Sequence, residues 1–261
     1  MNIIVAIIII GILCYFANNY LVVTEYTIDK GLKNRSLNIV QLSDLHNKEF
    51  GENNSKLISK VKKLNPDVIF LTGDVVDANR TNIKVAIKTA KQLVKIAPVY
   101  YVSGNHELSL EYEERADLEM RLEDAGVIVM YDEVADFNDD FQIIGLDDGS
   151  IDTNSDVLKK LAAKCDSSKT TILLAHEPQV FDWYVESGVD IVLCGHAHGG
   201  QVRIPFVNIG LVAPNQGLFP KYTSGVFEKK NTSMVISRGL GNSILPLRIF
   251  NQPEIVRIIV N

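Results

Sequence analysis

All five histidines of the chain lie in short polar blocks, and each block directly follows an apolar run. The blocks are Asp44-Leu45-His46, Gly73-Asp74, Gly104-Asn105-His106-Glu107, Ala175-His176-Glu177-Pro178 and Gly195-His196-Ala197-His198. Imidazole, carboxylate and amide groups together suit Mn, Fe or Zn, whereas Ca and Mg prefer a shell of oxygens. Since no cysteine lies in the blocks, a structural zinc cage is disfavoured. The sequence therefore predicts one polar metal site at the ends of several strands.

Spacing within the blocks supports this prediction. Asp44 and His46 stand two residues apart, as do His196 and His198. In extended chain, residues at this spacing project to the same side, so each pair can bring two ligands to one pocket. Each block alone has an ordinary explanation as a turn, helix cap or loop. Those explanations do not account for every histidine following a strand.

The elements that must position these residues alternate along the first half of the chain. Apolar runs at 37–42, 68–71, 99–102 and 127–130 are typical of strands covered on both faces. Helical spacing fills the intervals at about 54–64, 82–96 and 110–125. This alternation predicts an α/β fold.

The second half of the chain shows a different order of elements. We expect strands at 141–146, 171–174 and 191–193, a turn at 147–149, and helices at 155–164 and 178–184. Apolar stretches at 234–236 and 255–260 are expected to be strands of a second sheet. The fold, not one linear motif, must therefore bring the five blocks together.

Composition limits the classes of function. The 261 residues carry a net charge of −6, and their 46% hydrophobic content is sufficient for one large domain over residues 24–261. No basic run exceeds two residues, which disfavours nucleic-acid binding and a nuclease. The three cysteines are widely spaced and indicate no disulfide framework.

The N-terminal segment is strongly apolar. No charged residue occurs between Met1 and Val23, and this length is close to that of a bilayer-spanning helix. We therefore predict an uncleaved transmembrane anchor over residues 1–23 and a cell-membrane location; a buried helix or strand is the alternative. Lys30, Lys33 and Arg35 follow the segment and weakly favour a cytoplasmic catalytic domain, but the side of the membrane stays open.

Taken in order, the blocks resemble the pattern of calcineurin-like metallophosphoesterases: D-x-H, G-D, G-N-H-[DE], H and G-H-x-H. The resemblance covers about residues 37–260. It implies a four-layer αββα sandwich of two mixed β-sheets flanked by helices. Within the family, the segments 41–46, 195–201 and 237–241 are similar to the membrane-linked bacterial branch of YkuE-like and YaeI-like phosphoesterases.

The resemblance implies two divalent metal ions, of Mn, Fe or Zn, and a role for each block. One ion would be held by Asp44, His46, Asp74 and His198, and the other by Asp74, Asn105, His176 and His196. The shared Asp74 and a bridging hydroxide would belong to the catalytic centre. His106 would contact the phosphate and protonate the leaving oxygen. Glu107 is expected to orient His106, with Asp77 in support.

The resemblance implies hydrolysis of a phosphoester, and we expect the bond to be a phosphodiester or pyrophosphate. Asn47 and Ala78-Asn79 replace residues typical of the family's protein phosphatases, which argues against that activity. The apolar N-terminus favours a lipid-linked or nucleotide-sugar substrate. A soluble nucleotide phosphodiesterase or phosphomonoesterase, or a non-catalytic metal-binding scaffold, is the alternative. Substrate entry is expected to be shaped by Phe206, Phe219 and Tyr222, with ordinary loop packing equally compatible; the oligomeric state is open.

Overall fold

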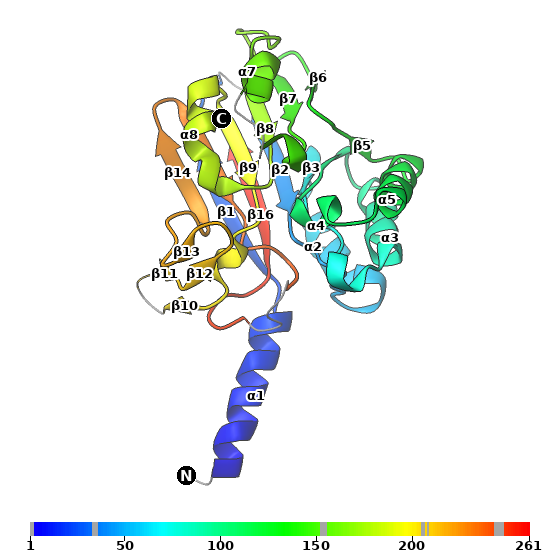
Figure 1. The fold of residues 1–261 in the computed structure, drawn as a ribbon, viewed down its shortest axis with the longest axis vertical. Helices are drawn as coiled ribbons and strands as arrows, with labels where there is room; N and C mark the ends of the chain where they lie inside the picture. Colours follow the sequence, from blue (N-terminus) through cyan, green and yellow to red (C-terminus); the bar gives the residue numbers. More distant parts are fainter. Residues whose placement is uncertain (1–2, 33–35, 152–155, 205–206, 208, 243–247) are drawn as a thin grey trace.

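Two six-stranded mixed sheets form the centre of the protein in the computed structural model (Figure 1). The structure describes residues 3–32, 36–151, 156–204, 207, 209–242 and 248–261. The α/β class and the two mixed sheets were both predicted from the sequence, and both are confirmed.

The first sheet contains the strands that precede the first three polar blocks. Strands β2 to β5 are parallel, β16 is antiparallel to β2, and β1 is parallel to β16. In spatial order the strands are β1 (Val22–Ile28), β16 (Glu254–Val260), β2 (Leu37–Leu42), β3 (Val68–Thr72), β4 (Val99–Val102) and β5 (Ile128–Val129).

The second sheet contains the strands that precede the last two blocks. Its four central strands, β15, β9, β8 and β7, are parallel, and its two edge strands are antiparallel to their neighbours. In spatial order they are β14 (Gly225–Lys229), β15 (Thr232–Ile236), β9 (Ile191–Cys194), β8 (Thr170–Leu174), β7 (Phe141–Gly145) and β6 (Glu133–Asp136).

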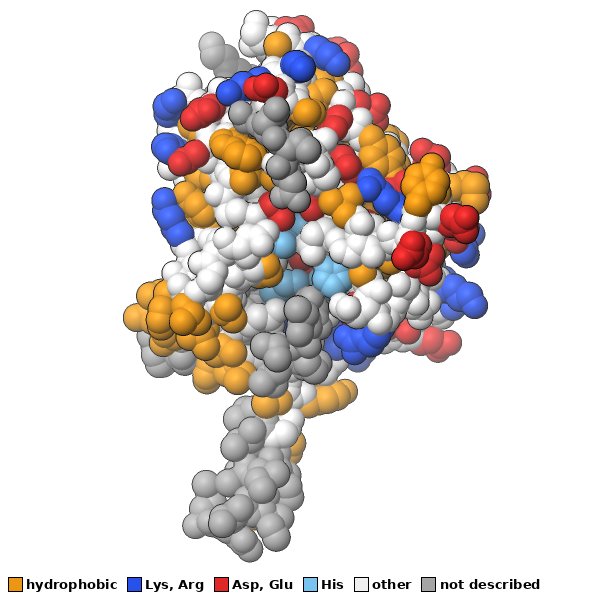
Figure 2. Space-filling view, in the orientation of Figure 1, with side chains coloured by type: hydrophobic (Ala, Val, Ile, Leu, Met, Phe, Trp, Pro, Cys, Tyr) orange, Lys and Arg blue, Asp and Glu red, His pale blue; other side chains and the backbone are white. Residues whose placement is uncertain are grey.

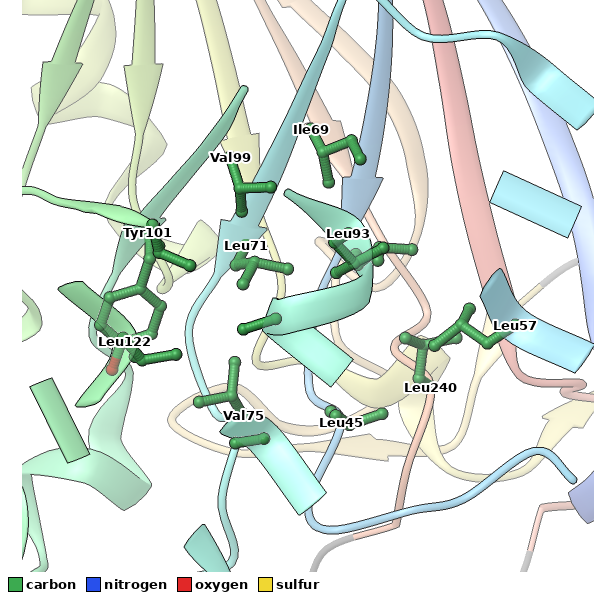
Figure 3. Close-up of a cluster of buried hydrophobic side chains, with 14 of the residues drawn as sticks. Leu45, Leu57, Ile69, Leu71, Val75, Leu93, Val99, Tyr101, Leu122 and Leu240 are labelled. Atoms are coloured by element: carbon green, nitrogen blue, oxygen red, sulfur yellow. The ribbon is translucent and has the colours of Figure 1, made fainter. Parts of the chain in front are cut away.

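Helices cover the outer face of each sheet, and this leaves an apolar layer between the sheets. The first sheet packs against α2 (Ser55–Leu64), α3 (Ile83–Leu93) and α5 (Tyr112–Asp124), and the second against α7 (Asp156–Ala162) and α8 (Phe181–Ser187). Figure 3 shows Leu93 of α3 near Ile69 and Leu71 of β3, and Leu57 of α2 beside Leu240 in the same buried cluster. Residues of both sheets, among them Phe70 and Ile172, form the central layer.

Short elements carry the polar blocks and complete the described structure. They are the helices α4 (Asn105–Leu108) and α6 (Asp148–Ile151), the 3-10 turns η1 (Glu52–Asn54), η2 (Ala78–Arg80), η3 (Pro178–Val180) and η4 (His198–Gly200), and the strands β10 (Arg203–Ile204), β11 (Ile209–Gly210), β12 (Val212–Ala213) and β13 (Gly217–Leu218). Residues 148 and 149 thus begin a short helix where only a turn was predicted.

The two ends of the chain depart from the predictions. Strand β16 lies in the first sheet, so the expectation that residues 255–260 join the second sheet was wrong. Helix α1 (Ile3–Asn19) ends before residues 22 and 23, which begin β1 and pair with Glu254 and Ile255. The apolar stretch at 20–23 therefore does not continue the N-terminal helix.

Among the helices within the described residues, none combines the length and the apolar character needed to cross a membrane. The expected transmembrane anchor over residues 1–23 is thus not supported. The division into residues 1–23 and 24–261 remains a prediction.

Candidate metal centre

Loops after strands of both sheets converge on one polar site. Strands β2, β3 and β4 end just before Asp44, Asp74 and Asn105, and β8 and β9 end just before His176 and His196. Carboxyl ends of parallel strands are the usual place for sites in open α/β sheets. Figure 2 shows histidine side chains gathered at the centre of one face of the molecule.

Within this site the side chains form two groups that could hold metal ions. One group is Asp44, His46, Asp74 and His198; the other is Asp74, His176 and His196. In each group the candidate ligand atoms lie within 4.8 Å of one another, and all these residues are buried. Asp74 is common to both groups, as expected for a shared ligand.

The Asp74 carboxylate is held in a fixed orientation between the two groups. Its Oδ1 accepts a hydrogen bond of 2.9 Å from the His106 backbone N–H. Its Oδ2 lies 3.4 Å from His46 Nε2 and 3.2 Å from His176 Nε2. Although burial alone would raise its pKa, the charge and hydrogen bond of His176 hold the pKa of Asp74 well below its usual range. One oxygen is therefore anchored by backbone while the other faces both groups.

His176 is oriented by its second ring nitrogen. Nδ1 donates a hydrogen bond of 2.8 Å to the Thr72 carbonyl, which directs Nε2 towards Asp74. Although burial lowers the pKa of His176, the neighbouring Asp74 carboxylate raises it well above its ordinary value. Two electron-rich atoms at this separation need a cation between them, either a proton or a metal ion.

The atoms around Asp44 also fit a metal ion. Its Oδ1 accepts a hydrogen bond of 3.0 Å from the His196 backbone N–H, while its buried Oδ2 has no hydrogen-bond partner among the described residues. Burial raises the pKa of Asp44 to about 6. Burial also lowers the pKa of His46 to about 4, so this imidazole is neutral at pH 7. His46 Nε2 and His198 Nε2 are 3.2 Å apart, and a shared cation satisfies both lone pairs.

Asn105 brings an amide oxygen to the second group. Its Oδ1 lies 2.8 Å from His196 Nδ1. Burial lowers the pKa of His196 to about 3, so this ring is also neutral at pH 7. All seven residues predicted as metal ligands thus lie together, and their individual roles as ligands remain predictions.

Backbone conformation at the site is unusual for the residue types present. Asp44, His46, Asp74, His196 and His198 all have left-handed φ values, between 43° and 65°. For residues with a Cβ this conformation costs about 1–2 kcal/mol each. Such strain persists at functional sites when the surrounding structure enforces it.

Glycines allow the loops to approach the carboxylates closely. A Cβ atom at Gly195 would overlap Asp44 Oδ2, and one at Gly104 would overlap Asp74 Oδ1. Both positions therefore require glycine for space.

Glu107 has a different role from the one expected. Its Oε2 accepts hydrogen bonds from the Asp74 and Gly104 N–H groups, at 2.7 and 2.8 Å, and its Oε1 accepts one of 3.1 Å from Val76 N–H. Burial raises the pKa of Glu107 to about 8. Glu107 thus joins the loops after β3 and β4, and the prediction that it orients His106 was wrong.

His106 lies beside the first group and is oriented by other residues. Its ring is 4.5 Å from the His46 ring, edge to face. Its Nδ1 accepts a hydrogen bond of 3.1 Å from Ala78 N–H and lies 3.8 Å from Asp77 Oδ1. Because Nδ1 accepts, the proton of the neutral ring is on Nε2. Asp77 is thus the carboxylate beside His106.

One residue at the site was missed by the sequence analysis. The Asn215 side-chain amide donates to Glu177 Oε1 at 3.1 Å and lies 3.4 Å from His196 Nε2. Asn215 belongs to the turn between β12 and β13, and Asn-Gln-Gly in a turn gives no sign of such a contact.

The three aromatic residues expected at the entrance have different positions. Tyr222 packs between Phe181 and Phe227, with ring centroids 5.8 and 5.0 Å away. Phe219 is exposed, and Phe206 lies outside the described residues. Tyr222 therefore contributes to packing between α8 and the second sheet.

A protein-family model described as calcineurin-like phosphoesterase matches residues 37–200, which include all five blocks. The chain belongs to this family. It is thus a metal-dependent phosphoesterase by family, and the buried Asp and His groups fit the two metals that the family typically binds.

Relatives in three bacteria are named as family members or as a phosphodiesterase. The chain is 32% identical over 231 residues to metallophosphoesterase Cj0846 of Campylobacter jejuni, an alignment that covers 85% of this chain and 58% of that protein. It is 28% identical to metallophosphoesterase YkuE of Bacillus subtilis, covering 92% and 86%. It is 27% identical to phosphodiesterase YaeI of Escherichia coli, covering 84% and 80%. YkuE and YaeI are thus among the relatives of this chain, as predicted from the sequence.

Solved structures support the fold. A dimetal phosphatase from Danio rerio aligns with a TM-score of 0.52 and 11% identity, covering 78% of this chain and 88% of that one. At this identity the likeness concerns the fold alone.

Proposed function

We propose that this phosphoesterase uses two metal ions to hydrolyse a phosphodiester or pyrophosphate bond. The observation that carries the proposal is the position of Asp74, whose Oδ2 lies within 3.4 Å of Nε2 atoms from both groups. When bound, two divalent ions supply a nucleophilic water at neutral pH and neutralise charge on the phosphoryl oxygens.

The protein's own residues have three tasks in this scheme. Asp44, His46 and His198 would hold one ion, Asn105, His176 and His196 would hold the other, and Asp74 would be shared by both. Glu107 fixes the loops that present Asp74 and Asn105. Burial keeps His46 and His196 neutral at pH 7, so each ring has an unprotonated nitrogen that can donate its electron pair to a metal ion.

His106 has the proton-transfer task. Since its Nδ1 accepts from Ala78 N–H, the neutral ring presents Nε2–H as a hydrogen-bond donor. To give the Nε2 proton to the leaving oxygen and return to the neutral ring, His106 would first take up a second proton on Nδ1. General acid catalysis of this kind contributes about 10² to 10⁴ in rate. Asp77 Oδ1, 3.8 Å from Nδ1, is the carboxylate that would face the Nδ1–H of that doubly protonated ring.

For the substrate, we propose a diester or pyrophosphate linked to a lipid or a sugar nucleotide, and a location at the cell membrane. The apolar sequence of α1 supports the lipid link, because such a segment partitions to lipid where substrates of this kind reside. The relative YaeI is a phosphodiesterase by name, and this supports a diester.

The first test measures metal content and reaction class. The full chain is used, because β1 begins at Val22 and a truncation at residue 26 would remove half of that strand. Two ions per chain and faster turnover of bis-p-nitrophenyl phosphate than of p-nitrophenyl phosphate, with Mn²⁺ added, are expected. Faster monoester turnover would indicate a phosphomonoesterase. If the wild-type protein binds two ions but hydrolyses neither compound, and His106→Asn behaves in the same way, the protein is a metal-binding scaffold.

The second test concerns the lipid link. One pyrophosphate head group is offered on a long acyl chain in mixed micelles and on a short water-soluble chain. A kcat/KM at least about tenfold higher for the long chain, equivalent to about 1.4 kcal/mol, is expected. Equal values would redirect the search to soluble nucleotide diesters.

A further inference from the structure

Exposed apolar side chains are concentrated at one end of the molecule. Among the described residues, fifteen large apolar side chains are exposed, and eleven of them lie in α1 or directly after it at Tyr20, in the hairpins after η4, or at position 250. We define the apolar hairpin surface as Ile204, Val207, Ile209, Leu218, Phe219 and Phe250. Figure 2 shows apolar side chains beside the base of α1, and Figure 1 places β10 to β13 at that end.

The apolar hairpin surface is continuous with α1. One groove is lined by side chains from the end of α1, by Tyr20 directly after it, and by residues 248–250 and 252. Val202 forms a β-bridge with Ile249, and Arg203 N–H donates to the Ile249 carbonyl at 3.0 Å. Phe219 N–H donates to the Leu211 carbonyl at 2.9 Å, which connects the two hairpins. Backbone contacts thus join the hairpins to the segment at residue 249, and this segment shares a groove with α1.

Carboxylates are missing from the sequence of these segments. The chain has 32 Asp and Glu residues, yet residues 1–24 contain none and residues 191–253 contain only Glu228. Glu228 lines a different groove, with Asp29 and Lys30. The basic residue Lys221 follows Phe219 closely, with its Nζ 4.7 Å from the Tyr222 ring. In a chain with net charge −6, this is a surface that anionic lipid head groups do not repel.

Two phenylalanines on the surface are held outward by unusual backbone. Phe219 and Phe250 each have a φ of 51°, and each is 62% exposed. A left-handed conformation is rare for bulky residues. Phe and Leu side chains are typical of protein surfaces that lie in the interface of a bilayer.

The same hairpins reach the metal centre. Asn215, which contacts Glu177 and lies 3.4 Å from His196 Nε2, is only three residues from Leu218. A surface that contacts lipid at Leu218 and Phe219 therefore brings the metal centre close to the head groups.

We propose that the apolar hairpin surface inserts into the interface of a lipid bilayer and seats the metal centre beside it. Binding to a second copy of the chain is the alternative way to bury these apolar side chains. The bilayer is favoured because residues 1–24 and the hairpin segments lack carboxylates while Lys221 follows Phe219, a combination that suits anionic lipid head groups. The proposal concerns where the protein binds and does not depend on the proposed reaction.

The test places a fluorescent probe on the surface. The chain has a single tryptophan, Trp183 in α8, so Phe219→Trp in a Trp183→Phe background reports on one position. The matched control is Tyr112→Trp in the same background, because Tyr112 is exposed on α5. Vesicles contain phosphatidylethanolamine and phosphatidylglycerol, with or without brominated acyl chains. The measurement needs neither substrate nor turnover, so its failure is distinct from failure of the proposed reaction.

Insertion predicts a shift of the Phe219→Trp emission to shorter wavelength and several-fold stronger quenching by brominated chains than for Tyr112→Trp. Equal quenching at both positions would overturn the proposal, since α1 alone would then account for any binding. A shift that grows with protein concentration in the absence of vesicles would overturn it in favour of a second copy. Phe250→Trp is a second probe in case one variant does not fold, and the same outcomes apply to it.

Discussion

The two sheets contribute different chemistry to the metal centre. Loops of the first sheet supply every oxygen donor, from Asp44, Asp74 and Asn105, while loops of the second sheet supply His176, His196 and His198. His46 is the exception, an imidazole from the first sheet. Charge and donor type are thus divided between the two halves of the fold.

This division separates metal retention from metal selection. The two carboxylates of the first sheet carry the negative charge that retains divalent ions in a buried site. The nitrogen donors, mostly from the second sheet, favour Mn, Fe or Zn over Mg or Ca. Asp74 Oδ2 joins the two contributions, since it faces His46 and His176 at once.

Replacing Asp74 by Asn tests the division most severely. Because the variant removes the one charge that faces both groups, we expect loss of both ions and a fall in kcat/KM of about 10³ or more, from several kcal/mol of lost charge stabilisation. Metal analysis of the purified variant measures this. Retention of one ion at full occupancy would contradict the shared role.

His106→Asn separates chemistry from metal binding on the side of the first sheet. Both ions should remain, because the His106 side chain lies outside both groups, while kcat falls by about 10² to 10⁴. Loss should be smaller for a substrate whose leaving group needs no proton, such as p-nitrophenolate. If metal is lost instead, His106 is a ligand.

Glu107→Gln examines how firmly the first sheet fixes its oxygens. The two carboxylate oxygens of Glu107 accept from the backbone N–H groups of residues 74, 76 and 104, and Gln keeps only one of these two oxygens. Metal affinity should fall by about 10- to 100-fold, as for other residues that orient ligands. Glu114→Gln on the exposed side of α5 is the control and should have wild-type affinity.

The number of protons released when metal binds distinguishes a ligand of the first sheet, Asp44, from one of the second, His176. Ligands bind metal without their protons. In the metal-free protein Asp44, with a pKa of about 6, is mostly protonated at pH 5 and mostly ionised at pH 7, while His176 is protonated at both. Metal binding should thus release about one proton at pH 7 and about two at pH 5, which calorimetry in buffers of different ionisation enthalpy measures. An unchanged count in wild type, or a pH-dependent count in Asp44→Asn, would contradict this assignment.

The sequence predicted most strands and the clustering of all seven expected ligands, because each ligand block follows an uninterrupted apolar run. It could not assign β16 to a sheet, since residues 255–260 would be equally buried in either one. The sequence analysis also assigned the wrong role to Glu107. Because Glu107 is next to His106 in the chain, it was expected to orient that ring, but the helical turn of α4 directs its carboxylate to the loop N–H groups. The left-handed conformation of Asp44 and His198 has no local sequence signal. Both residues are hydrogen-bonded to distant loops, Asp44 Oδ1 to the His196 N–H and the His198 carbonyl to the Asn251 amide.

The position of β16 between β1 and β2 has a consequence for synthesis of the protein. A ribosome that has completed β2 at Leu42 must add more than 200 residues before Glu254 emerges. At about 5 to 20 residues per second this takes roughly 10 to 40 s. During that time β1 and β2 expose unpaired edges that invite aggregation. Nascent chains of this protein are therefore expected to need a holding chaperone, and stalled translation before β16 should yield insoluble products with no partial activity.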